Sequence, residues 1–268
     1  MATVRSADGT EIDYEVQGDG PVLILVDGAM CYRDAGPMRP IAEQVRDEFS
    51  VVLYDRRGRG SSGDTLPFDV DREIDDIDAL IGATADDGPA MIFGISSGGA
   101  LALRATERLG PDRVTRVALY EPPFMPEPAV AAAAAYTEEL SAALDRGHAG
   151  EAAALFFRRV GMPAEAVEGM RHSPGWPAIE AIAPTLAYDD AAMGDSRVPT
   201  AVAARVGVPV LTLAGGSSPD FLRYGATGVA DAAPNGRFDI VGGQTHDIQA
   251  SAVAPHLKGF FGGDDASA

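Results

Sequence analysis

The sequence predicts an α/β fold, with a mostly parallel sheet covered by helices on both faces. Short apolar runs rich in Val, Ile and Leu recur along the chain, and segments with apolar residues at helical spacing separate them. The length of 268 residues and the hydrophobic content of 46% are enough for one large core. Strands that alternate with helices form a parallel sheet, and catalytic residues are then expected at the carboxyl ends of the strands.

The strands are predicted where short apolar runs end in glycine, proline or charged residues. Residues 3–6 and 11–16 alternate around a turn at residues 8–10, and this pattern predicts an opening hairpin. The buried strands of the parallel sheet are predicted at residues 21–26, 51–54, 91–95, 114–120, 208–214 and 237–241.

Helices are predicted between these strands, at residues 37–47, 69–80, 100–108, 221–233 and 247–261. Residues 125–198 differ from the rest because they are alanine-rich and helical in pattern, with breaks at proline and glycine and no strand signal. We therefore expect an α/β core formed by residues 1–124 and 199–262, with a helical lid, residues 125–198, inserted before the penultimate strand. The small, acidic tail at residues 263–268 is expected to be disordered.

The composition excludes several classes of partner. With 40 Asp plus Glu against 21 Lys plus Arg, the net charge is -19, which repels nucleic acid and anionic membrane surfaces. No apolar run is long enough to span a membrane, and the N-terminus lacks a signal peptide, so a cytoplasmic protein is expected. Cys31 and four scattered His residues offer no metal-ligand spacing, so no metal is expected.

The stretch of residues 94–98 contains the most informative motif. It reads G-x-S-x-G, and it lies where a predicted strand turns sharply into a predicted helix. This context is typical of a nucleophile elbow, in which the serine hydroxyl stands above the sheet, so Ser96 is the candidate nucleophile. A glycine-rich turn that only caps the helix or binds an anion is the alternative interpretation.

A serine nucleophile needs a base and an oxyanion hole. Of the four histidines, His246 lies in the loop after the last predicted strand, whereas His148 and His172 fall in the lid and His256 in the last helix. Gly28 follows the strand at 21–26 and lets the backbone turn its N–H groups toward the space above that strand.

On these motifs the chain resembles the α/β-hydrolases along nearly all its length. The resemblance rests on the elbow at residues 94–98, the charged glycine loop at 55–60 and the segment 244–247. It implies that Ser96 is the nucleophile and His246 the base. It also implies that the oxyanion hole is formed by the N–H of Ser97 and one from Gly28 or Ala29.

The acid of the triad departs from the commonest pattern of the family. Most members carry an Asp after the strand that follows the lid, where this chain has Ser218, with Asp220 nearby beyond a proline. The other family arrangement places a Glu at the end of the strand before the lid, where this chain has Glu121, followed by two prolines. An unpaired buried carboxylate is costly, and His246 would be its partner. Position therefore favours Glu121, and Asp220 stays the alternative.

A closer resemblance is to zearalenone lactonase-type hydrolases. It rests on Asp27-Gly28 in place of His-Gly, on Ile95-Ser96-Ser97-Gly98 at the elbow, and on Glu121-Pro122 at the turn that carries the acid. This resemblance implies a Ser-His-Glu triad and a lid tryptophan, Trp176, over the substrate. Asp27 and Met30 are further candidates for substrate contact.

The sequence thus predicts a serine hydrolase of carboxylic esters or lactones that needs no cofactor. Aromatic and methionine residues in the lid indicate a hydrophobic small-molecule substrate of moderate size. The same triad would also serve acyl transfer, perhydrolysis or carbon-carbon bond hydrolysis. A ligand-binding receptor of the same fold with vestigial activity is the second alternative.

Overall fold

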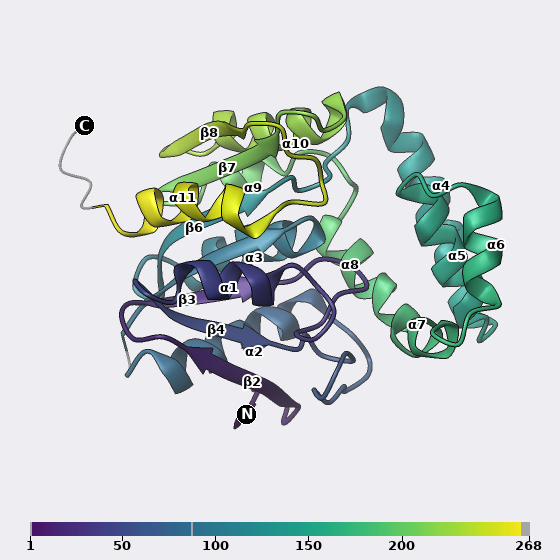
Figure 1. Cartoon of the computed structure of the whole chain (residues 1–268), viewed down its shortest axis with the longest axis horizontal. Coiled ribbons are helices and arrows are strands. Elements are labelled where there is room, and N and C mark those ends of the chain that lie inside the picture. Colours follow the sequence, from purple (N-terminus) through teal and green to yellow (C-terminus); the bar gives the residue numbers. More distant parts are fainter. Residues whose placement is uncertain (1, 87, 264–268) are drawn as a thin grey trace.

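The computed structural model describes residues 2–86 and 88–263, and it contains an eight-stranded sheet with helices on both faces (Figure 1). The strand order is β1-β2-β4-β3-β5-β6-β7-β8. The strands are β1 (Ala2–Arg5), β2 (Glu11–Gln17), β3 (Val22–Val26), β4 (Ser50–Tyr54), β5 (Ala90–Ile95), β6 (Val114–Tyr120), β7 (Val210–Gly215) and β8 (Gly236–Val241). β2 pairs antiparallel with β1 and β4, and all the other neighbours in this order are parallel. The predicted α/β fold with a mostly parallel sheet is confirmed.

The strands lie close to their predicted positions. β3 and β7 begin at Val22 and Val210, slightly later than expected, because Pro21 and Pro209 have no N–H group to donate to a neighbouring strand. The tail predicted at residues 263–268 lies, beyond Gly263, outside the described residues.

The helices of the core are α1 (Met38–Val45), α2 (Val70–Thr84), α3 (Ser97–Leu109), α9 (Thr200–Ala203), α10 (Asp220–Ala232) and α11 (Ala250–Phe261). They lie on the two faces of the sheet, because α2, α3 and α10 share one hydrophobic core with the strands and α1 and α11 share the other. The four-residue helix α9 was not predicted, because it is too short to show helical periodicity.

The central strands supply side chains to two separate hydrophobic cores. In β3, Ile24 and Val26 belong to the core under α2, α3 and α10, whereas Leu23 and Leu25 belong to the core under α1 and α11. Successive side chains of a strand point to opposite faces, so a strand buried on both faces must be apolar at every position. This explains why the strands appear in the sequence as unbroken apolar runs.

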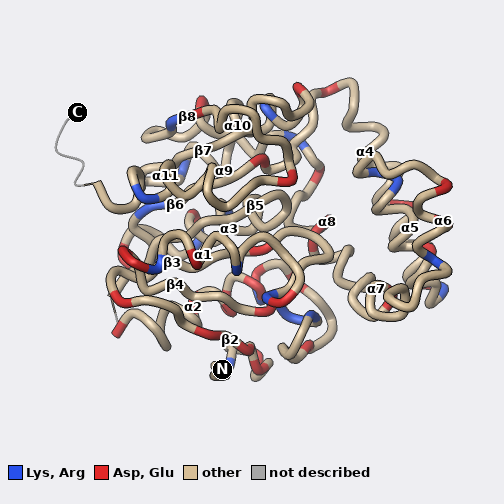
Figure 2. The backbone as a smooth tube through the Cα atoms, in the orientation of Figure 1, with Lys and Arg blue, Asp and Glu red and all other residues tan. Residues whose placement is uncertain are grey.

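A helical insertion separates β6 from β7 and lies to one side of the sheet (Figure 1). It comprises α4 (Glu127–Asp145), α5 (Ala149–Arg159), α6 (Ala164–Arg171), α7 (Trp176–Ile182), the short 3-10 helix at Ala183–Thr185 and α8 (Leu186–Met193). We call α4 to α7 the cap. The cap has a small core of its own, which includes Leu140, Ala153 and Trp176. Acidic positions occur in the cap as well as along the core (Figure 2).

The last helix of the insertion, α8, packs on the α/β core rather than on the cap alone. Ala192 and Met193 are buried in the same hydrophobic core as Leu101 and Leu103 of α3. Residues 125–198 therefore do not form one uniform layer, because α8 covers α3 while α4 to α7 extend away from the sheet (Figure 1).

The turn after β6 is held by a close approach of α10. A Cβ on Gly225 would lie 2.5 Å from the Pro122 carbonyl oxygen and 3.1 Å from the Phe124 nitrogen. The helix can therefore contact this backbone only if residue 225 has no side chain.

We predict that Gly225→Ala lowers the free energy of unfolding by about 3 kcal/mol, because the methyl group would force α10 away from the turn. Gly259→Ala in α11 is the matched control, since a Cβ there meets nothing within 4 Å. Its better helix propensity should leave stability unchanged or raise it by up to about 1 kcal/mol. Urea unfolding of both variants measures the difference, and equal stabilities would contradict the prediction.

Candidate active site

A sharp turn joins β5 to α3, and Ser96 stands at its apex. Ser96 has φ 56° and ψ -129°, a backbone conformation that a residue with a Cβ rarely adopts. A Cβ on Gly94 would come within 2.4 Å of the Gly98 carbonyl oxygen, and one on Gly98 within 2.4 Å of the Val26 carbonyl oxygen. The two glycines thus let helix and strand cross closely, and the half-buried Ser96 lies at the carboxyl edge of the sheet.

His246 lies in the loop between β8 and α11, and its imidazole contacts the Glu121 carboxylate. The distance from Nδ1 to Glu121 Oε2 is 2.7 Å. A carboxylate only accepts hydrogen bonds, so Nδ1 carries the hydrogen, and Nε2 of the neutral ring keeps its lone pair. The His246 side chain is 42% exposed, whereas that of Glu121 is wholly buried. The buried Glu121 carboxylate thus orients the partly exposed His246 ring at the surface of the site.

Glu121 is held at the end of β6 by its backbone and by both of its carboxylate oxygens. Its φ is 47°, and its N–H donates to the Leu213 carbonyl oxygen at 3.0 Å. Oε1 accepts a hydrogen bond from the Gly215 N–H at 2.7 Å, while Oε2 faces His246. These contacts orient the carboxylate before any ligand binds.

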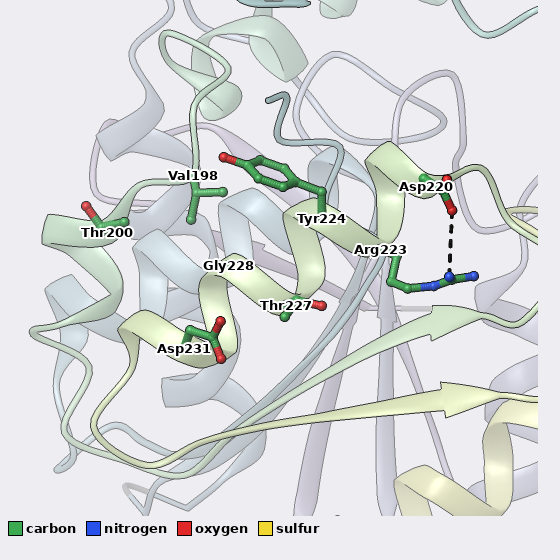
Figure 3. A pocket seen from close by; sticks show the side chains of 8 residues that line it. All are labelled: Val198, Thr200, Asp220, Arg223, Tyr224, Thr227, Gly228 and Asp231. Atoms are coloured by element: carbon green, nitrogen blue, oxygen red, sulfur yellow. Dashed lines mark ion pairs between the residues drawn. The ribbon is translucent and has the colours of Figure 1, made fainter. Parts of the chain in front are cut away.

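The alternative acid, Asp220, lies elsewhere. It begins α10, its side chain is 98% exposed, and its carboxylate pairs with Arg223 at 3.6 Å. The pair lies at a surface groove of about 490 Å³ along α10. Figure 3 shows the pair together with Tyr224 and Thr227, which also line the groove. Of the two carboxylates weighed from the sequence, the structure brings Glu121 to His246 and directs Asp220 to the surface.

The loop after β3 comes close to the apex of the elbow. A Cβ on Gly28 would lie 3.0 Å from the Ser96 Cβ and 3.7 Å from the Ser96 Oγ. Ala29 follows in the same loop, and Ser97 is the first residue of α3, where N–H groups have no partner within the helix. Of the three residues expected to form an oxyanion hole, Gly28 is thus close to Ser96 in space and Ser97 follows it in sequence, while Ala29 is the residue after Gly28.

A buried acid that the sequence analysis did not identify lies directly behind this site. Asp189 of α8 accepts a hydrogen bond from the Ser97 hydroxyl at 2.8 Å, and its two oxygens each lie 2.6 Å from a guanidinium nitrogen, of Arg56 and Arg59 respectively. The positive charges and the Ser97 contact hold the pKa of Asp189 below its usual range despite burial. Arg56 and Arg59, closely spaced in the loop after the buried strand β4, were the signal that could have revealed such a network.

Asp27, expected to contact substrate, is enclosed by its own loop. Its side chain is 3% exposed, and a Cβ on Gly36 would lie 2.8 Å from its Oδ1. Burial raises the pKa of the Asp27 carboxyl to about 7, against the opposing effect of the Arg59 and Arg56 charges. Asp27 is thus part of the interior that supports Gly28, and substrate contact by its side chain stays a prediction.

Met30 and Trp176 differ in their exposure. Met30, with φ 59°, is half-buried and packs against the cap core, so the loop after β3 touches the cap. Trp176 is 5% exposed, and its indole N–H donates to Glu180 at 2.8 Å. Its ring lies 6.5 Å from that of Phe157. Trp176 therefore packs the cap, and a role over the substrate stays a prediction.

Among residues 2–86 and 88–263, no three His, Cys, Asp or Glu side chains gather in a way that could hold a metal ion. Within the same residues, no helix has the length and apolar character needed to cross a membrane.

We predict that Asp27→Asn stabilises the protein at neutral and alkaline pH. The folded Asp27 carboxyl keeps its proton up to about pH 7, whereas in an unfolded chain it loses the proton near its ordinary pKa of 3.8. Since the folded state binds the extra proton, the stability of the parent falls as pH rises between these values, by up to about 4 kcal/mol. Asparagine cannot ionise, so the advantage of the variant should grow from pH 5 to pH 7 and then level off.

Asp8→Asn is the control with the opposite sign. Burial alone would raise the pKa of Asp8, but hydrogen bonds from Arg57 and Thr10 lower it well below its usual value. Its contribution is therefore present at neutral pH and lost as pH falls, so Asp8→Asn should be less stable than the parent at pH 8. Denaturant unfolding at several pH values measures both variants, and a pH-independent difference for Asp27→Asn would refute the assignment.

The chain is similar to known hydrolases over most of its length. An alpha/beta hydrolase from Sphaerobacter thermophilus DSM 20745 is 42% identical, with a TM-score of 0.83 over 97% of this chain and 100% of that one. A hydrolase from Pseudomonas aeruginosa PA01 shares 23% identity and a TM-score of 0.73 over 98% of each chain, which shows the common fold.

The sequence is also similar to that of a further hydrolase. A stretch of 117 residues is 33% identical to the uncharacterized hydrolase YraK of Bacillus subtilis (strain 168), and it spans 42% of this chain and 42% of that protein. Residues 23–256 match the Alpha/beta hydrolase family. This match runs from β3 into α11 and includes the elbow, Glu121 and His246, and the chain belongs to the alpha/beta hydrolase family.

Proposed function

We propose that this alpha/beta hydrolase cleaves carboxylic esters or lactones through an acyl-enzyme formed on Ser96. The observation that carries the proposal is the contact of 2.7 Å between His246 Nδ1 and the buried Glu121 carboxylate, at the sheet edge that also holds the strained Ser96. Ser96, His246 and Glu121 follow β5, β8 and β6, respectively. These positions support the proposed Ser-His-Glu triad, with Ser96 as nucleophile, His246 as base and Glu121 as acid.

The reaction begins with proton transfer from the Ser96 hydroxyl to His246 Nε2 as the oxygen attacks the ester carbonyl. The imidazolium that forms is stabilised by Glu121, whose own position is held by the Gly215 N–H. The proton then passes to the leaving alkoxide oxygen, and the C–O bond breaks. A water molecule deprotonated by His246 attacks the acyl-enzyme and releases the carboxylic acid and free Ser96.

The negative charge of the tetrahedral intermediate would be held by backbone N–H groups. The Ser97 N–H at the start of α3 and one N–H from the Gly28–Ala29 loop are the donors in this proposal. Each preorganised donor of this type stabilises a transition state by about 3 kcal/mol. The close approach of Gly28 to Ser96 supports this assignment.

The substrate is proposed to be hydrophobic and of moderate size. The cap is built on apolar side chains, and Ala29 and Met30 of the loop beside Ser96 pack against it. An apolar acyl or alcohol group bound between loop and cap would be removed from water. The resemblance to zearalenone lactonase-type hydrolases in the Glu121-Pro122 turn and in Asp27-Gly28 supports a cyclic ester as one member of the substrate class.

The proposal is tested by labelling and activity. The parent should react with a fluorophosphonate probe and hydrolyse p-nitrophenyl esters or an aryl lactone, and Ser96→Ala should lose both properties with its fold intact. Removal of a triad serine lowers kcat by at least about a thousandfold. Circular dichroism checks the fold. A folded parent that is not labelled, or a Ser96→Ala variant that stays active, would contradict the proposal.

The acid is tested by removing charge without changing shape. Glu121→Gln keeps the volume and an oxygen for the Gly215 N–H but loses the charge that stabilises the imidazolium, so kcat should fall by about 10⁴-fold. Asp220→Asn is the control, because its exposed side chain lies on α10, and its kcat should stay within about twofold of the parent. Steady-state kinetics on one ester measures both variants. If Asp220→Asn lost its activity while Glu121→Gln kept it, Asp220 and not Glu121 would be the acid of the triad.

A further inference from the structure

The guanidinium of Arg59 is anchored behind the loop that borders Ser96. Its Nη1 donates to the Gly28 carbonyl oxygen at 2.7 Å and to the Cys31 carbonyl oxygen at 3.3 Å. Its Nη2 lies 2.6 Å from Asp189 Oδ2, and its Nε donates to the Thr185 hydroxyl at 3.0 Å. Arg59 is 1% exposed, so these bonds form away from water, where they are strongest.

The contact with Gly28 has a consequence for the neighbouring N–H. The Gly28 carbonyl and the Ala29 N–H belong to one planar peptide group, with oxygen and hydrogen on opposite sides. A cation bonded to the oxygen therefore fixes the plane and directs the N–H away from Arg59. It also draws electron density toward the oxygen, which makes the N–H a stronger donor.

The preceding peptide group is supported in the same way. Arg56 Nη1 donates to the Asp27 carbonyl oxygen at 3.2 Å, and that carbonyl shares its peptide group with the Gly28 N–H. Glu73 binds Arg56 through both oxygens, and Asp189 lies between Arg56 and Arg59. Two buried carboxylates thus balance the two buried guanidinium groups, and Asp189 also binds the Ser97 hydroxyl.

We infer that Arg59 is a positioning residue for the oxyanion hole, which orients and polarises the Gly28–Ala29 peptide from the side opposite the substrate. The inference rests on the proposed acyl-enzyme function and names the buried contacts that support it. Asp189 is part of these contacts, because its carboxylate binds both Arg59 and the elbow residue Ser97. Arg59 does not touch the substrate, and it acts only through the peptide group that it binds.

Arg59→Lys tests the inference because a lysine ammonium cannot reach Thr185, Gly28 and Asp189 at once. We expect kcat for p-nitrophenyl acetate to fall about 10- to 100-fold while KM stays within about twofold, since the oxyanion forms only in the transition state. The inhibition constant of a trifluoromethyl ketone, which forms a tetrahedral oxyanion on Ser96, should rise by the same factor.

Arg57→Lys is the matched control. Arg57 lies in the same loop and is equally buried, but it binds Asp76 and Asp8, away from residues 27–31. This variant should lose stability as Arg59→Lys does, yet keep kcat and the inhibition constant of the parent. Equal kinetic losses in both variants would overturn the inference, because they would reflect general damage to the loop.

Thr185→Val keeps the test decisive if Arg59→Lys does not fold. It removes the hydroxyl that receives the Arg59 Nε–H and leaves the ion pair with Asp189 in place. A loss of about 3- to 10-fold in kcat at unchanged KM supports the inference, and an unchanged kcat overturns it. If the parent itself does not react with the fluorophosphonate probe, the proposed function is wrong. Failure of the proposed function is therefore distinguishable from failure of the inference about Arg59, which shows as an unchanged kcat in Thr185→Val.

Discussion

Opposite charges buried together tie the segments of the site to one another. Arg56 and Arg59 lie in the loop after β4, Glu73 lies in α2, and Asp189 lies in α8. A buried ion is costly unless opposite charge and hydrogen bonds satisfy it completely, and removing one partner leaves an uncompensated charge. The four groups are therefore compatible with few arrangements of the loop, the two helices and the backbone at residues 27–28. Because of this desolvation cost, the network is weak evidence for added stability.

Backbone strain is concentrated at the same edge of the sheet. Among the described residues, five other than glycine have positive φ, and three of them are Met30, Ser96 and Glu121. Each such residue costs about 1 to 3 kcal/mol and persists only where its surroundings impose it. The crossing of α3 over β5 and the hydrogen bonds around Glu121 supply that constraint. Rigid surroundings thus fix Ser96 and Glu121 before a substrate arrives.

The two parts of the helical insertion pack in different places. α8 packs into the core of the sheet, and its Asp189 binds Ser97 next to the candidate nucleophile. The cap keeps a separate core and meets the rest of the site at Ala29 and Met30. Because the cap does not share the core of the sheet, its side chains can vary without disturbing the elbow. This division suits a family in which one catalytic arrangement serves many substrates.

The sequence alone determined the sheet, the elbow at Ser96 and the loop that carries His246. These features depend on local rules, namely the period of apolar residues and the need for small residues at a sharp turn. Only the tertiary structure decided how distant residues meet. Glu121 and His246 are 125 positions apart, Arg56 and Asp189 are 133 apart, and Asp189 showed no local pattern at all. The burial of Asp27 and Trp176 was likewise decided by how loop and helices pack. Such contacts follow from the crossing of whole elements, and no short stretch of sequence encodes that crossing.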